Sequence, residues 1–162
     1  MSFAAGFRFY NQRILSFSSV PSQVEAKNLE KNIPTRITIS KVAIDVVVEV
    51  STITDGVWQI SNSGASFLDI SAGIGEGGNI VIYGHNKARI FGYIRNLKKA
   101  DVIELQDKNG NKHKYKVETI KIVEPDNIDY VQPKNRETLT LYTCTGLFDS
   151  KRHIVVAYPI LD

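Results

Sequence analysis

The pattern of apolar and polar residues changes near Pro34, and this change divides the chain into two parts. Apolar residues of the first part recur at helical spacing, as in Phe3, Phe7, Tyr10 and Ile14. Good helix formers occupy residues 22–32. We therefore expect residues 1–33 to form a helical or extended appendage and residues 34–162 to form a single domain.

The second part carries alternating or continuous β-branched runs, which are typical of strands. The expected strands lie within 35–42, 43–50, 79–85, 101–108, 112–125, 138–144 and 152–160. Asn109-Gly110-Asn111 indicates a hairpin between two of them, and Asp55-Gly56 indicates a turn before the only tryptophan. A helical turn is expected at 65–70 and a short helix within 88–101. About eight strands with few helices predict an all-β barrel or sandwich.

Composition narrows the class of protein. The 162 residues are 43% hydrophobic and 23% charged, which is ordinary for a globular domain with one core. A net charge of +3 with scattered basic residues does not favour nucleic acid as a partner. The printed sequence holds no run of about 20 apolar residues, the length needed to span a bilayer. The single cysteine excludes an internal disulfide.

That cysteine, Cys144, ends the apolar strand "TLYTC" just before a turn that contains Gly146. A lone cysteine is most often a small buried hydrophobe. Its position at a strand end, where a rigid scaffold can present it to an opening, favours a nucleophile instead. A nucleophilic thiol needs a nearby base or cation, because its ordinary pKa of about 8.5 leaves it mostly protonated at neutral pH.

One of the three histidines fits the role of that base. His85 ends the strand "NIVIYGH" as Cys144 ends its own, and Gly84 would let the backbone turn there. His113 lies between two lysines of a hairpin and is expected to face solvent. His153 follows Arg152 in a strand and should point to the opposite face from it.

Arg152 is the candidate cation. If residues 145–151 form a tight connection, Arg152 begins the antiparallel partner strand and lies beside Cys144. Its guanidinium could then stabilise an oxyanion, a role worth roughly 3 kcal/mol. A surface ion pair with Asp149 is an equally good reading of the same residues.

No metal or other cofactor is expected. The cysteine and histidines lack zinc-site spacing, and residues 73–79 lack the ending of a phosphate-binding loop. No acidic cluster stands out as a calcium site, although calcium dependence is not decided by the sequence.

Several of these motifs together resemble the sortase family. "TLYTC" matches the TLxTC motif of sortases, "GNIVIYGHN" resembles the segment with their catalytic histidine, and "RHIVVA" resembles their following strand. "DGVW", "EGGN", "IFGYIRNLKKADVIEL" and "VEP" occur in the order found in sortase domains. The resemblance covers residues 34–162 and implies a closed eight-stranded sortase-type β-barrel with short helices.

The resemblance also implies a chemistry. Sortases are cysteine transpeptidases that cleave an LPxTG-like sorting signal, form a thioester and pass the surface protein to an amine of a cell-wall precursor or a pilin lysine. By matching position, Cys144 would be the nucleophile, His85 the general acid and base, and Arg152 the oxyanion or substrate stabiliser. Thr143 could contact substrate or serve structure. The loop 125–137 would shape the substrate pocket, with Ile128, Tyr130 and Val131 as its apolar candidates.

By the same resemblance the enzyme would act at the outer face of a bacterial cell membrane. Sortases usually carry a membrane anchor, so residues 1–33 would follow one that has been removed. The short gap between Cys144 and Arg152 resembles the small housekeeping or class D/E enzymes more than the pilin-polymerising ones, although residues 1–33 could still act as a lid. An inactive peptide-binding barrel and a peptidase that resolves the thioester with water are the alternatives.

Overall fold

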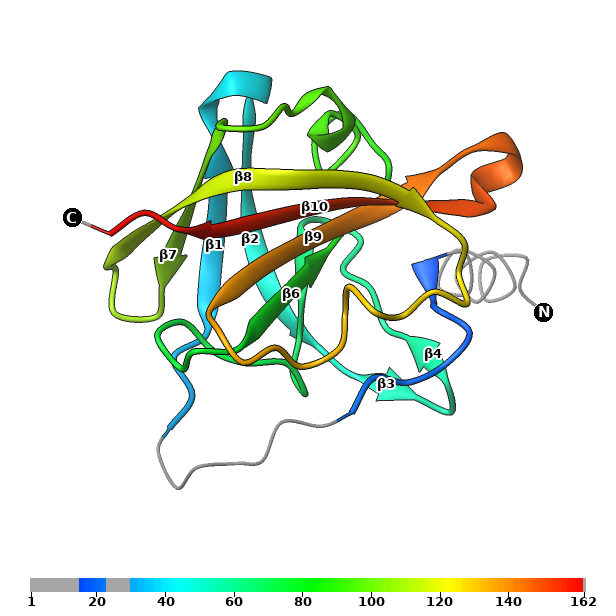
Figure 1. Cartoon of the computed structure of the whole chain (residues 1–162), viewed down its shortest axis with the longest axis horizontal. Coiled ribbons are helices and arrows are strands. Elements are labelled where there is room, and N and C mark those ends of the chain that lie inside the picture. The colour runs from blue at the N-terminus through cyan, green and yellow to red at the C-terminus, as the bar shows by residue number, and fades with distance from the viewer. Residues whose placement is uncertain (1–14, 23–29, 162) are drawn as a thin grey trace.

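A computed structural model describes residues 15–22 and 30–161. Eight strands close into a barrel in the order β1-β2-β5-β6-β9-β10-β8-β7 (Figure 1). These strands are β1 (Pro34–Ile39), β2 (Ile44–Ser51), β5 (Ala65–Leu68), β6 (Asn79–Tyr83), β7 (Val102–Asp107), β8 (Lys112–Val123), β9 (Thr138–Thr145) and β10 (Lys151–Pro159). The expected closed eight-stranded barrel is therefore confirmed.

The remaining elements are short. Strands β3 (Ile53–Thr54) and β4 (Val57–Trp58) form a separate hairpin around the predicted Asp55-Gly56 turn. Single 3-10 turns are η1 (Ser40–Val42), η2 (Ile94–Asn96) and η3 (Leu147–Asp149). None of these turns has the length or hydropathy of a membrane-spanning segment, and the described ranges contain no other candidate.

Two local predictions are wrong. Residues 65–68 are not a helical turn but strand β5 (Ala65–Leu68), which pairs in parallel with β2 and antiparallel with β6, and only Asp69 and Ile70 lie in a turn. The helix expected within 88–101 is reduced to the single turn η2. Its apolar residues Phe91, Ile94 and Leu97 are nevertheless buried, as their spacing indicated. In both places tertiary pairing and packing override the local pattern.

Two apolar clusters lie on opposite faces of the barrel wall. The first fills the barrel and includes Leu139, Leu141 and Val155. The second lies on the outer face of β6, β9 and β10 and includes Tyr142, Cys144 and Ile154. Alternation along β9 and β10 thus sends odd-numbered side chains inward and even-numbered side chains to the outer face over these stretches.

Of the described part of the first 33 residues, 15–22 lie against this outer face, whereas Ile33 packs against the cluster inside the barrel. Residues 15–22, blue in Figure 1, run beside the β3–β4 hairpin, where the Trp58 amide donates to the Ser16 hydroxyl over 3.0 Å. The helix expected from Phe3 to Ile14 lies outside the described residues, as does most of the expected 22–32 segment.

Candidate active site

The end of β9 and the start of β10 bring the predicted nucleophile and cation together. Cys144 and Arg152 are directly opposed in the antiparallel pair, and both side chains belong to the outer face. The connection between them is closed by Gly146, whose φ of 82° is a left-handed conformation that glycine adopts without strain. The expected cross-strand register is therefore present.

The Cys144 thiol is buried, with 3% of the residue exposed. Burial raises the pKa of this thiol to about 12, although the positive charge of Arg152 opposes the shift and Asp149 adds to it. In the observed arrangement the side chain is thus a thiol rather than a thiolate. Formation of the thiolate requires that water or a polar group reach the sulfur.

His85 is placed by the parallel pairing of β6 with β9. The last registered pair is Tyr83 with Tyr142, so His85 and Cys144 each lie two residues past it on adjacent strands. Beyond that pair, the Gly84 amide donates to the Tyr142 carbonyl over 3.3 Å. The Thr143 hydroxyl donates to the Gly84 carbonyl over 2.7 Å. These bonds fix the backbone of the histidine to the backbone of the cysteine.

Thr143 is fully buried and its hydroxyl is engaged by Gly84. This geometry agrees with the structural alternative for Thr143 rather than with a substrate contact.

Gly84 is required because a side chain would not fit at this position, and not because the backbone adopts a conformation that only glycine allows. Its φ is not in the left-handed region, contrary to the conformational role expected for it. A Cβ at this position would lie 2.8 Å from Ile90 Cγ2 and 3.2 Å from Phe91 Cγ. Ile90 and Phe91 therefore pack directly against the backbone of Gly84, the residue that precedes His85.

The three histidines have different surroundings. His85 is 9% exposed, and burial together with the charge of Lys87 lowers the pKa of its ring. His153 is also buried, opposite Thr143, and burial with nearby Arg95 lowers its pKa. His113 keeps part of its side chain exposed, and its Nε2 lies 2.8 Å from the buried carboxylate of Asp107, a partner that the sequence did not indicate.

Arg152 is buried, with 3% exposed, so the alternative of a surface ion pair with Asp149 does not apply. Its Nη1 donates to the backbone carbonyls of Asp149 and Lys151, each over 3.1 Å. Its Nη2 donates to the Ser16 carbonyl over 2.7 Å. Its Nε is buried and has no hydrogen-bond partner among the described residues.

The loop that precedes β9 supplies one wall beside this constellation. Val131 is buried in the outer cluster, and Ile128 and Tyr130 pack against it partly exposed. The carbonyl of Tyr130 accepts a 2.9 Å hydrogen bond from the Asn79 amide, which holds the loop to β6. All three predicted apolar residues thus lie in or against the cluster that contains Cys144.

Sequence reasoning missed the aromatic lining of the site. The rings of Tyr83 and Tyr142 stack at 5.1 Å, and Trp58 meets both edge-on. It also missed Phe17, whose ring lies 4.9 Å from that of Tyr142. Leu15 and Phe17 alternate with serines, a pattern that could have predicted an extended segment with one buried face. The helical spacing of the apolar residues up to residue 14 led to the expectation of a helix instead.

Within the described residues, no group of three or more His, Cys, Asp or Glu side chains is arranged to hold a metal ion. The groups gathered at this site are thus a thiol, an imidazole and a guanidinium on neighbouring strand ends.

Known proteins with similar sequences and structures place this geometry in a family. The sortase domain model matches residues 37–160. Sortase A of Bacillus anthracis is 35% identical over 98 residues, which cover 59% of this chain and 46% of that protein. The chain therefore spans about half the length of this curated relative.

Solved sortase structures share the barrel. A Clostridium perfringens sortase D5 transpeptidase superposes with a TM-score of 0.68 at 26% identity, over 82% of this chain and 83% of that one. A C. perfringens sortase C with the C-terminal cell-wall sorting motif gives a TM-score of 0.65 at 23% identity, over 83% of this chain and 75% of that one, and supports the fold alone. With the family model matched over most of its length, the chain belongs to the sortase family.

Proposed function

We propose that this protein is a cysteine transpeptidase that cleaves an LPxTG-like sorting signal and transfers the surface protein to an amine. The observation that carries the proposal is that Cys144 and Arg152 lie directly opposite each other on β9 and β10, and that His85 follows the end of the neighbouring strand β6. Membership of the sortase family supports the same chemistry.

In the first half-reaction, neutral His85 takes the proton of the Cys144 thiol as the sulfur attacks the carbonyl carbon of the scissile amide. The buried Arg152 Nε, which has no acceptor in the described part of the chain, supplies an N–H for the developing oxyanion. The C–N bond then breaks, and the protonated His85 ring gives its proton to the leaving amine. The acyl group remains on sulfur as a thioester.

The second half-reaction returns the enzyme to its first state. The acceptor amine attacks the thioester carbonyl, His85 takes the proton from the attacking nitrogen, and the C–S bond breaks as His85 passes that proton to the leaving sulfur. The new amide leaves, and Cys144 is again a thiol. We propose a cell-wall precursor or a pilin lysine as the source of the amine, and the outer face of a bacterial cell membrane as the location.

The test is a fluorogenic LPxTG-type peptide panel with and without an amine acceptor. Cys144→Ala should abolish cleavage, and His85→Gln should reduce it at least 100-fold, since general acid–base catalysis contributes about 10²–10⁴-fold. His113→Gln is the matched histidine control, because His113 lies at the far end of β8 from the site. Full activity of Cys144→Ala would refute the proposed nucleophile.

Product masses separate the related chemistries. Joined peptide and amine support transpeptidation, whereas a free carboxylic acid in the presence of saturating amine would establish a peptidase. No reaction with any peptide, together with peptide binding, would establish a binding barrel instead.

A further inference from the structure

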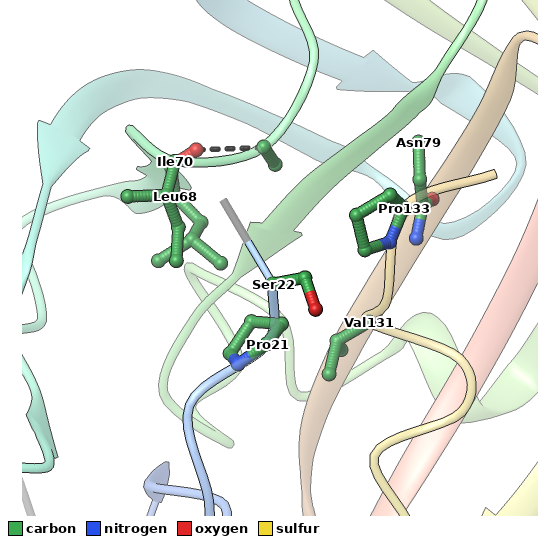
Figure 2. A pocket seen from close by; sticks show the side chains of 8 residues that line it. Pro21, Ser22, Leu68, Ile70, Asn79, Val131 and Pro133 are labelled. Carbon is green, nitrogen blue, oxygen red and sulfur yellow. Dashed lines mark hydrogen bonds between the residues drawn. The ribbon is translucent and has the colours of Figure 1, made fainter. Parts of the chain in front are cut away.

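The connection between β9 and β10, residues 146–150 and hereafter the tip, carries two adjacent apolar side chains that face solvent. Leu147 is 78% exposed and Phe148 is 88% exposed. Elsewhere on the outer face such side chains are packed together, as Figure 2 shows for Leu68 and Val131 beside Pro21. Single exposed apolar residues are ordinary, but two large neighbours on a projecting turn indicate a contact with another molecule.

The backbone holds the tip in a conformation that is unfavourable for its sequence. Phe148 has a φ of 54° and Asp149 a φ of 57°, both in the left-handed region that bulky residues rarely adopt. Two backbone hydrogen bonds of 3.2 Å, from the Asp149 amide to the Gly146 carbonyl and from the Ser150 amide to the Leu147 carbonyl, close the turn. Strained backbone of this kind is concentrated at functional sites. Phe148 therefore does not serve the stability of the fold.

A second surface feature follows His85. Residues 86–99, hereafter the basic segment, contain no acidic residue and five exposed basic ones: Lys87, Arg89, Arg95, Lys98 and Lys99. Among the described residues, only Lys99 of these five has an ion-pair partner, Glu118 at 2.8 Å. Tyr93 of the same segment is 43% exposed and combines an apolar ring with a polar hydroxyl. The basic segment thus presents an excess of positive charge to solvent.

The tip and the basic segment lie at the same end of the barrel. Strands β6 and β9 are parallel, so the segments that follow them leave the barrel at one end, and both lie in the upper half of Figure 1. The charge of Lys87 lowers the pKa of His85, and the charge of Arg95 lowers that of His153, as expected for a cationic segment close to this end. The two features therefore lie on either side of the candidate site at Cys144.

This combination fits a lipid bilayer better than a protein partner. A stable protein interface buries about 1,200 Å² or more of complementary surface, and two side chains on a projecting turn offer much less. A bilayer needs no such complementarity, because a short apolar tip can enter the headgroup region while basic residues are attracted to the lipid phosphates.

We propose that the tip and the basic segment form a docking surface for an anionic lipid bilayer, into which Leu147 and Phe148 insert. This surface goes beyond the proposed reaction and does not depend on it, since binding to lipid needs no peptide. Docked in this way, the protein presents Cys144 and His85 at the bilayer surface.

The test is sedimentation of the full chain with vesicles, either of phosphatidylcholine alone or of equal parts phosphatidylcholine and phosphatidylglycerol. We expect binding to the anionic vesicles, and Leu147→Ser and Phe148→Ser should each lower the partition coefficient at least about tenfold, because an apolar side chain no longer leaves water. Phe148→Trp keeps an aromatic ring and should preserve binding. Leu161→Ser is the matched control, because Leu161 is also 88% exposed but follows β10 at the opposite end of the barrel.

The contribution of the basic segment is measured with the same vesicles. Arg89→Gln combined with Lys98→Gln should weaken binding about fivefold per charge removed at low salt, and the difference should shrink as salt screens the charges. Lys112→Gln combined with Lys114→Gln removes two exposed lysines from the start of β8, at the opposite end, and should leave binding unchanged.

Three results would overturn the proposal: no binding of the parent to anionic vesicles, equal binding of the parent and the Leu147→Ser, Phe148→Ser double variant, or equal binding to neutral and anionic vesicles. If the parent instead self-associates without vesicles and the double variant does not, the tip is a contact between copies of the chain and the bilayer is refuted. Melting temperatures no lower than that of the parent would show that the variants remain folded.

The docking surface and the transpeptidase can fail independently. Vesicle binding that depends on the tip, without turnover of any sorting peptide, supports the docking surface and refutes the transpeptidase. Peptide turnover by a parent enzyme that does not bind vesicles supports the transpeptidase and refutes the docking surface.

Discussion

The hydrogen bond from Thr143 to Gly84 should be the main link between the nucleophile strand and the histidine. Thr143→Val keeps the β-branched shape but removes the donor of the 2.7 Å bond. A typical hydrogen bond contributes about 1 kcal/mol, and a buried acceptor left without its donor costs about 1–3 kcal/mol. We therefore expect the free energy of unfolding to fall by about 2 kcal/mol.

Thr143→Val should also affect catalysis, because it changes the position of His85. At roughly 2–4 °C per kcal/mol for a chain of this size, the melting temperature should fall by about 4–8 °C. With only the 3.3 Å bond from the Gly84 amide left to tie the backbone before His85 to β9, kcat for the sorting peptide should fall by about tenfold or more, while KM changes little, because a displacement of about 1 Å can cost 10²-fold.

Calorimetry and steady-state kinetics on one preparation measure both effects. Thr119→Val is the matched control, because Thr119 lies on β8 and its hydroxyl makes no hydrogen bond within the described residues. A variant with unchanged melting temperature and unchanged kcat would show that the bond does not hold the site together.

Three further changes test other parts of the structure. Gly84→Ala should lower the melting temperature by several degrees, since its Cβ would lie 2.8 Å from Ile90 Cγ2 and overpacking costs about 1–3 kcal/mol. Burial alone would raise the pKa of Asp107, but hydrogen bonds, led by the one from His113, hold this pKa below its ordinary value. The stabilisation of the fold by the Asp107 carboxylate should therefore be lost progressively as pH falls below about 4. Asp107→Asn should show a smaller decrease of the melting temperature over the same pH range. Phe148→Asn should raise the unfolding free energy by up to about 1 kcal/mol, because Phe148 has a φ of 54° and is 88% exposed; an unchanged or lower denaturant midpoint would contradict this.

Most strands of the barrel, though not β5, could be predicted from the local pattern of residues alone. Alternation in residues 138–144 and 152–160 predicted β9 and β10, and Asn109-Gly110-Asn111 predicted the turn between β7 and β8. The position of Cys144 at a strand end, with Arg152 after a short connection, followed from the same periodicity. These features are determined by residues that are close together in the chain, so the sequence pattern was sufficient to predict them.

Other features depend on segments that are distant in the chain. The parallel pairing of β6 with β9 sets His85 near Cys144, yet nothing local specifies it. Strand β5 was expected as a helical turn because only its pairing with β2 and β6 makes it a strand.

The sequence by itself thus determined the all-β class, and its motifs supplied the three residues of the candidate site. Only the tertiary structure decided that Phe17 packs against Tyr142 and that Ser16 accepts a hydrogen bond from Arg152, because the burial of an aromatic ring and the choice of an acceptor are settled by packing between remote segments. The same packing decided the protonation of Cys144, since the pKa of a thiol follows its solvation rather than its place in a motif.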